Sequence, residues 1–124
     1  MLRALIVEDH RLFREAFRTS LHERLPSVVI EEAGSGEEAL QRINGTPPDL
    51  IFTDMRLAGM NGLELSQELK KDFPRIRIAM LTGYDFSEYR RAASQQGVDH
   101  FFVKDSLDWK EIKGFVQDIP KDNR

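Results

Sequence analysis

Asp49-Leu50-Ile51-Phe52-Thr53-Asp54 is the stretch on which the fold prediction rests. Its middle is apolar and partly β-branched, Pro47 and Pro48 precede it, and a loop from Met55 to Gly62 follows it. This pattern is typical of a short strand that is buried on both faces of a sheet. In an open α/β sheet, ligands bind in the crevice at the carboxyl ends of the strands. The strand therefore delivers Asp54 to the place where chemistry is expected.

Outside this stretch, the chain alternates between apolar runs and amphipathic helical patterns. Strands are predicted at residues 2–7, 28–33, 49–54, 76–81 and 98–103, and helices at 10–25, 35–45, 61–73, 85–96 and 106–119. The predicted helix starts include capping boxes at Ser35 and Asn61 and an N-cap at Ser106. Strict alternation predicts a parallel sheet with right-handed crossovers and helices on both faces.

The composition excludes several classes of protein. A length of 124 residues fits one domain, and 40% hydrophobic with 31% charged residues is ordinary for a globular chain. The absence of cysteine excludes disulfides, thiolate metal sites and cysteine nucleophiles. The apolar run Ala4–Val7 is too short for a signal peptide or a membrane span, so we expect a cytoplasmic protein without membrane contact. A net charge of -3 argues against direct nucleic-acid contact by this domain.

Charged and hydroxyl side chains stand where four of the predicted strands end. They are Glu8 and Asp9 after the first strand, Asp54 at the third, Thr82 at the fourth and Lys104 at the fifth. Any single acid here is also explained as a helix cap or a turn residue. Three carboxylates that lie close together repel one another, and proteins usually offset this repulsion by binding Mg²⁺, which prefers oxygen ligands. A lysine and a hydroxyl can hold a transferred anion, so the set predicts phosphoryl chemistry on a carboxylate.

The combination resembles the receiver domains of two-component response regulators over essentially the whole chain. The matching segments are Val7-Glu8-Asp9-His10, Thr53-Asp54-Met55-Arg56-Leu57, Gly59-Met60-Asn61-Gly62, Leu81-Thr82-Gly83 and Phe101-Phe102-Val103-Lys104-Asp105. The resemblance implies an α/β, flavodoxin-like, doubly wound sheet of five parallel strands in the order 2-1-3-4-5, with five helices. It implies a receiver domain at residues 1–119, with residues 120–124 as a tail or the start of a linker. The residues around His10, Arg56 and Lys104-Asp105 are similar to those of the subfamily that usually carries a C-terminal helix-turn-helix output domain.

The resemblance also implies a function, which is a signalling switch and not an enzyme. Asp54 would accept a phosphoryl group from the phosphohistidine of a sensor histidine kinase and relay it as a conformational change, with transcriptional output. Lys104 would pair with the phosphoryl group, Thr82 would bond to it, and Phe101 would rotate with Thr82. The readout, and a homodimer, would use the face made by the fourth helix, fifth strand and fifth helix.

The same resemblance implies a Mg²⁺ site. Asp9 and Asp54 would bind the ion directly, Glu8 would bind it through water, and the backbone carbonyl of Arg56 would complete the protein's share. Arg56 and Tyr84 would flank the line along which water attacks the phosphorus, and both are long side chains. We therefore expect slow self-dephosphorylation.

This chain departs from the common receiver pattern at three places. Ala58 stands where receivers usually have proline, which predicts a less rigid loop after Asp54. Phe101 often corresponds to tyrosine. Asp105 replaces the proline that follows the lysine in many receivers, and since a cis peptide without proline costs about 3 kcal/mol, we expect a trans bond there.

Three other interpretations stay open at this stage. A pseudo-receiver would keep the fold and act as an interaction module without phosphorylation. The complete set of acids and the lysine argues against this interpretation. A phosphatase of the haloacid-dehalogenase type is disfavoured because Arg56 stands where its second acid belongs. The pattern G-x-G-x-x-A at residues 34–39 suggests a dinucleotide site, but Glu37 and Glu38 would place negative charge against the pyrophosphate, so helix capping explains it better.

Overall fold

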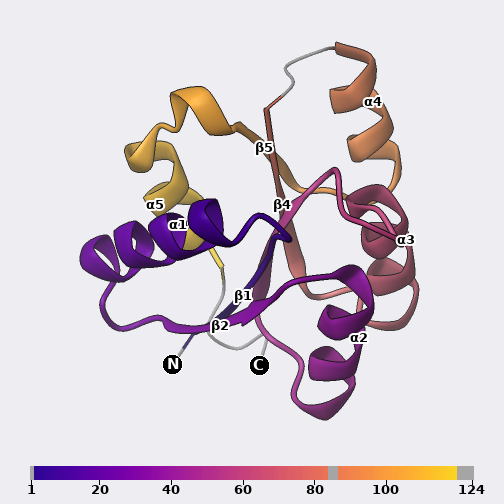
Figure 1. The fold of residues 1–124 in the computed structure, drawn as a ribbon, viewed down its shortest axis with the longest axis horizontal. Coiled ribbons are helices and arrows are strands. Elements are labelled where there is room, and N and C mark those ends of the chain that lie inside the picture. The colour runs from indigo at the N-terminus through magenta and orange to yellow at the C-terminus, as the bar shows by residue number, and fades with distance from the viewer. Residues whose placement is uncertain (1, 84–86, 120–124) are drawn as a thin grey trace.

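In the computed structural model, which describes residues 2–83 and 87–119 except for the side chains of residues 87–89, five strands form one parallel sheet. The strands are β1 (Arg3–Val7), β2 (Val29–Ala33), β3 (Leu50–Asp54), β4 (Arg77–Thr82) and β5 (His100–Val103), in the order β2-β1-β3-β4-β5 (Figure 1). The helices that alternate with them are α1 (Arg11–Arg24), α2 (Gly36–Gly45), α3 (Gly62–Asp72), α4 (Ser87–Gln95) and α5 (Trp109–Gln117). This is the flavodoxin-like, doubly wound architecture that the sequence predicts.

The helices cover the two faces of the sheet as separate layers, with α1 and α5 on one side and α2 and α3 on the other (Figure 1). β3 lies in the middle of the sheet, and all of its residues are buried. Leu50 and Phe52 pack into the α1 and α5 layer, while Ile51 packs into the α2 and α3 layer. The ring of Phe52 lies between those of Phe17 and Phe115, with centroid distances of 5.1 and 6.2 Å. Burial on both faces explains why this strand is a continuous apolar run.

The open edge of the sheet at β2 carries two adjacent acids. Consecutive strand residues project to opposite faces, so Glu31 and Glu32 each meet the helix layer on their own side. Glu31 forms ion pairs with Arg3 and with Arg42 of α2, and Glu32 forms ion pairs with two arginines of α1, Arg14 and Arg18. Both faces of the edge strand are therefore braced by arginine.

Helix capping agrees with the predictions at α3 and differs at α2 and α5. Asn61 and Glu64 form the complete predicted box at α3. At α2 the Ser35 side chain caps Glu38, but the Glu38 carboxylate accepts from the Gly34 amide, so the box is not reciprocal. The predicted N-cap at Ser106 is wrong, because Ser106 ends a short 3₁₀ turn, η1 (Lys104–Ser106).

The start of α5 is instead capped by Asp108, whose side chain accepts hydrogen bonds from the amides of Lys110 at 3.0 Å and Glu111 at 3.3 Å. Replacing Asp108 with Ala should lower the free energy of unfolding by about 1 kcal/mol, because two amides of the first turn lose their acceptor. Ser106→Ala is the matched control and should stay within about 0.5 kcal/mol of the wild type. Urea unfolding measures both, and equal losses would mean that Ser106 shares the cap.

Of the other expectations about the elements, one cannot be compared with the structure and one is confirmed. The predicted start of the fourth helix near Asp85 lies outside the described residues. The bond between Lys104 and Asp105 is trans, as predicted. None of the described helices is long and apolar enough to cross a membrane.

Candidate functional site

Parallel pairing brings the acids of β1 and β3 together at the carboxyl edge of the sheet. Val7 pairs with Thr53, so the residues that follow, Glu8 and Asp54, lie side by side. One carboxylate oxygen from each of Glu8, Asp9 and Asp54 lies within 4.8 Å of the other two. Glu8 is fully buried, Asp54 is 8% exposed and Asp9 is exposed. Three hard oxygen donors at this spacing fit a Mg²⁺ ion, with Asp9 on the solvent side.

Lys104 reaches into this acidic cluster from the end of β5. Its Nζ lies 3.2 Å from Oδ2 of Asp54 and donates a hydrogen bond to Oε1 of Glu8. The Lys104 side chain is 17% exposed, and its Nζ lies 4.4 Å from the centroid of the Phe13 ring. The lysine is thus held as a fixed positive charge between two carboxylates, with an aromatic face beside it.

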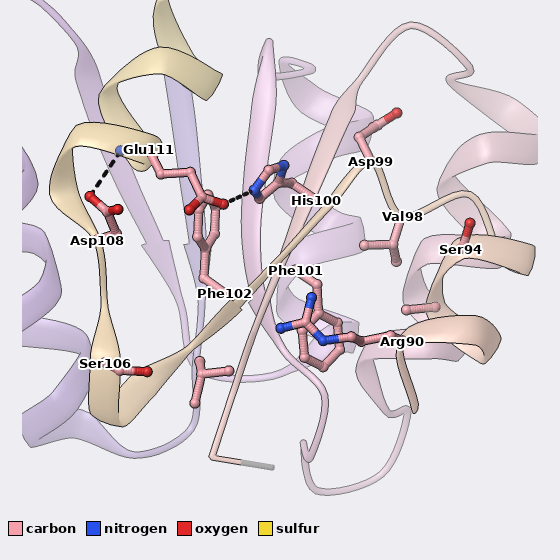
Figure 2. A pocket seen from close by; sticks show the side chains of 12 residues that line it. Arg90, Ser94, Val98, Asp99, His100, Phe101, Phe102, Ser106, Asp108 and Glu111 are labelled. Atoms are coloured by element: carbon pink, nitrogen blue, oxygen red, sulfur yellow. Dashed lines mark hydrogen bonds and ion pairs between the residues drawn. The ribbon is translucent and has the colours of Figure 1, made fainter. Parts of the chain in front are cut away.

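The other predicted residues lie around the cluster. Thr82 ends β4 and is buried, and the register places its neighbour Leu81 beside Asp54. Arg56 is exposed in the loop two residues after Asp54, and Tyr84 lies outside the described residues. Phe101 is half-buried on β5 and faces a cleft between α4 and α5 (Figure 2).

Burial raises the pKa of the Glu8 carboxyl, and the nearby charge of Asp54 acts in the same direction. Glu8 accepts hydrogen bonds from Lys104 and, at 3.0 Å, from the His10 amide. Both bonds favour the ionised form of Glu8, but they do not outweigh the effect of burial. Arg14 donates to the Glu8 backbone carbonyl at 2.7 Å and fixes the turn that carries the acid. The folded protein therefore holds a carboxylate that gains from an added cation.

Glu8→Gln should raise the stability of the metal-free protein at neutral and higher pH. Because the folded pKa lies above the unfolded one, the wild type loses stability as pH rises through the folded value, and the amide has no proton to lose. Thermal unfolding with a chelator at about pH 5 and about pH 8 measures this, and the advantage of the variant should be larger at about pH 8. Glu15→Gln, at an exposed site on α1, controls for the change of net charge. An advantage that is the same at both pH values would contradict the role of burial.

Gly62 lies in one of the segments that carry the family resemblance, and the structure gives it a role of its own beside Asp54. A Cβ at Gly62 would overlap with the backbone carbonyl of Asp54 and lie 3.0 Å from the Cα of Met55. The Gly62 amide donates to the Met55 carbonyl at 2.9 Å. The first turn of α3 therefore closes directly on the end of β3, and glycine is required for that approach.

The loop between β3 and α3 is also supported from α2. The Glu37 carboxylate accepts a hydrogen bond from the Met60 amide at 3.4 Å, and Gly59 turns the chain with a φ of 74°. A Cβ at Gly36 would lie 3.1 Å from the Met60 carbonyl, so the start of α2 packs closely against the loop. These contacts brace the loop that contains Ala58.

Comparison with known proteins places these residues in a family. Residues 4–116 match the response regulator receiver domain. The chain is 34% identical over 105 residues to response regulator protein VraR of Staphylococcus saprophyticus, an alignment that covers 83% of this chain and 49% of VraR. This chain thus spans about half the length of the curated relatives it matches.

Solved structures agree with the sequence relatives. Response regulator TrrA of Thermotoga maritima, in complex with Mg²⁺-BeF, is 33% identical with a TM-score of 0.84, and the alignment covers 97% of this chain and 100% of TrrA. A two-component response regulator of the LuxR family from an Aurantimonas species is 28% identical with a TM-score of 0.83, covering 93% of this chain and 81% of that one. With the family match running from residue 4 to residue 116, this chain belongs to the response regulator receiver domains of two-component systems.

Proposed function

We propose that this chain is a phosphoacceptor switch, which takes a phosphoryl group on Asp54 from a sensor histidine kinase with the help of Mg²⁺. The observation that carries the proposal is the contact of Lys104 with Asp54 at 3.2 Å, inside a cluster of three carboxylates. A cluster of this kind that bound neither a cation nor an anion would lower the stability of the folded protein. The solved structure of the related TrrA is a complex with Mg²⁺-BeF, which supports the proposal that this chain also uses Mg²⁺.

The transfer step follows from the charges at the site. A carboxylate oxygen of Asp54 attacks the phosphorus, the P–N bond to the histidine of the kinase breaks, and its electron pair goes to the imidazole. Lys104 stabilises the negative charge on the phosphoryl oxygens, because its Nζ already lies against the Asp54 carboxylate. Glu8, Asp9, Asp54 and the Arg56 carbonyl are the groups that would hold Mg²⁺, which supplies further charge neutralisation when bound.

The response to phosphorylation would start at the buried end of β4. A phosphorylated Asp54 carries about -1.5 to -2 charge and new acceptor oxygens, which the hydroxyl of Thr82 would bond. Movement of Thr82 would let Phe101 rotate and change the α4, β5 and α5 face, where a homodimer would form. The role is that of a switch and not of an enzyme with an external substrate, although Asp54 takes part in its own phosphorylation and hydrolysis.

The partners follow from the same family. A sensor kinase would be the phosphodonor in the cytoplasm, and the output would be transcriptional, in keeping with the LuxR-family relative and with relatives about twice as long as this chain. An interaction module that ignores phosphate is the alternative.

Asp54→Asn should abolish phosphoryl uptake, because the amide cannot act as the nucleophile. Intact-protein mass spectrometry after incubation with phosphoramidate, with and without Mg²⁺, should show one added phosphoryl group on the wild type only when Mg²⁺ is present. Asp105→Asn is the matched control, since Asp105 is an exposed acid next to Lys104 and should label like the wild type. Labelling of Asp54→Asn would move the acceptor elsewhere, and no labelling of the wild type would favour the interaction module.

A further inference from the structure

β5 forms the edge of the sheet opposite to β2, and one side of it lines a cleft of about 600 Å³ between α4 and α5 (Figure 2). Arg90 extends from α4 across this cleft so that its guanidinium lies over the ring of Phe101 (Figure 2). The distance from the Arg90 Cζ to the ring centroid is 4.7 Å. Arg90 itself is exposed, and Phe101 is half-buried.

The contact favours one position of the ring. A guanidinium over an aromatic face is attracted by the ring quadrupole and also covers apolar surface that water would otherwise meet. Both effects exist only while Phe101 stays on the cleft side of β5. Since Phe101 carries no hydroxyl, its ring has no hydrogen bond to water that would favour this position on the cleft side.

On the opposite face of the sheet, β5 is attached to α5. His100 and Glu111 form an ion pair across the two elements, and the His100 ring lies 4.4 Å from the ring of Phe102 and 5.7 Å from that of Phe115. These contacts do not involve α4. The Phe101 ring can therefore change position relative to α4 while the α5 side of β5 stays in place.

We propose that Arg90 is a positioning residue that holds Phe101 on the cleft side of β5. It thereby sets how much of the phosphoryl group, or of its mimic, must be bound at Asp54 before the Phe101 ring moves. The inference rests on the proposed function, because it assigns Phe101 a movement that follows phosphorylation. Removing the guanidinium should leave the acidic cluster intact and make the movement of Phe101 easier. Arg90 lies on α4, whereas the carboxylates and Lys104 lie where β1, β3 and β5 end.

The experiment measures the concentration of beryllofluoride, at fixed Mg²⁺, that moves half of the Phe101 ring signal in NMR spectra of phenylalanine-labelled protein. Arg90→Gln should lower this midpoint about two- to fivefold, as expected for an exposed cation–π contact. Arg90→Lys keeps a cation without the planar guanidinium and should give an intermediate value. Arg91→Gln is the matched control, since Arg91 is the exposed neighbour on α4 and its loss changes the net charge equally. Its midpoint should equal that of the wild type.

Three results would overturn the inference while the phosphoacceptor role stands. The first is an Arg90→Gln midpoint equal to that of the wild type, and the second is an equal shift in Arg91→Gln. The third is a Phe101 signal that does not move in wild-type protein that binds beryllofluoride. Phosphoryl uptake from phosphoramidate, measured by mass on the same four proteins, tests the proposed function separately. If the wild type accepts neither the phosphoryl group nor the mimic, the proposed function fails and the inference fails with it.

Discussion

Gly62→Ala should lower the free energy of unfolding by about 3 kcal/mol, at the upper end of the usual cost of overpacking. The added methyl would overlap with the Asp54 carbonyl and crowd the Met55 Cα, and both are backbone atoms that cannot rotate away. The end of β3 and the first turn of α3 must therefore separate. Because that movement carries Asp54 with it, the variant should also take up phosphoryl groups more slowly at any Mg²⁺ concentration.

Gly114→Ala is the matched control for this prediction. Gly114 lies in α5. Apart from its two chain neighbours and the backbone of its own helix, no atom of the described residues lies within 4 Å of the place that an added methyl would take. Alanine should therefore stabilise the helix by up to about 1 kcal/mol. Urea unfolding of both variants gives the comparison. A Gly62→Ala protein as stable as the wild type would show that α3 can withdraw from β3 at little cost.

Lys104→Met should be the most destabilising change at the acidic cluster itself. It removes the positive charge between Glu8 and Asp54 and leaves a fully buried carboxylate without its cation. Removing one partner of a fully buried ion pair costs about 3–5 kcal/mol, and the partial exposure of the Lys104 side chain reduces our expectation to about 2–3 kcal/mol.

The loss should depend on pH and on Glu8. Since the pKa of Glu8 is already raised by burial, removing the lysine raises it further, and the deficit should grow as pH rises and shrink toward about pH 5. Thermal unfolding across this range measures the deficit. Adding Glu8→Gln should restore most of the lost stability, whereas Lys71→Met, at an exposed site on α3, should change little. A deficit that Glu8→Gln does not reduce would place the contribution of Lys104 in packing against Phe13.

The sequence predicts the sheet because its signals are strong and local. The apolar run of β3 and the amphipathic helices determine the element order, and the family resemblance determines the strand order. Glu8, Asp54 and Lys104 could be assigned to one edge for the same reason, since parallel strands end together.

Features that depend on distances within loops could not be predicted in this way. Ser106 and Asp108 are both good N-cap residues, and the 3₁₀ turn after β5 determines which of them starts α5. The approach of Gly62 to the Asp54 carbonyl depends on how the intervening loop closes, which spacing does not give. The sequence placed Lys104 at the acidic cluster, but that it contacts buried Glu8 as well as Asp54 depends on side-chain directions in three dimensions.

The arginine-braced edge at β2 has a consequence for how this chain behaves at high concentration. An edge strand offers unpaired backbone groups to any other extended segment, and sheets that do not block this edge tend to join into larger aggregates. A second strand that approached β2 would have to pass the Glu31 and Glu32 ion pairs on both faces and desolvate charges that are only partly exposed. Since salt screens such pairs, the barrier to edge-to-edge association should fall as ionic strength rises, and the protein should stay monodisperse longest in dilute salt.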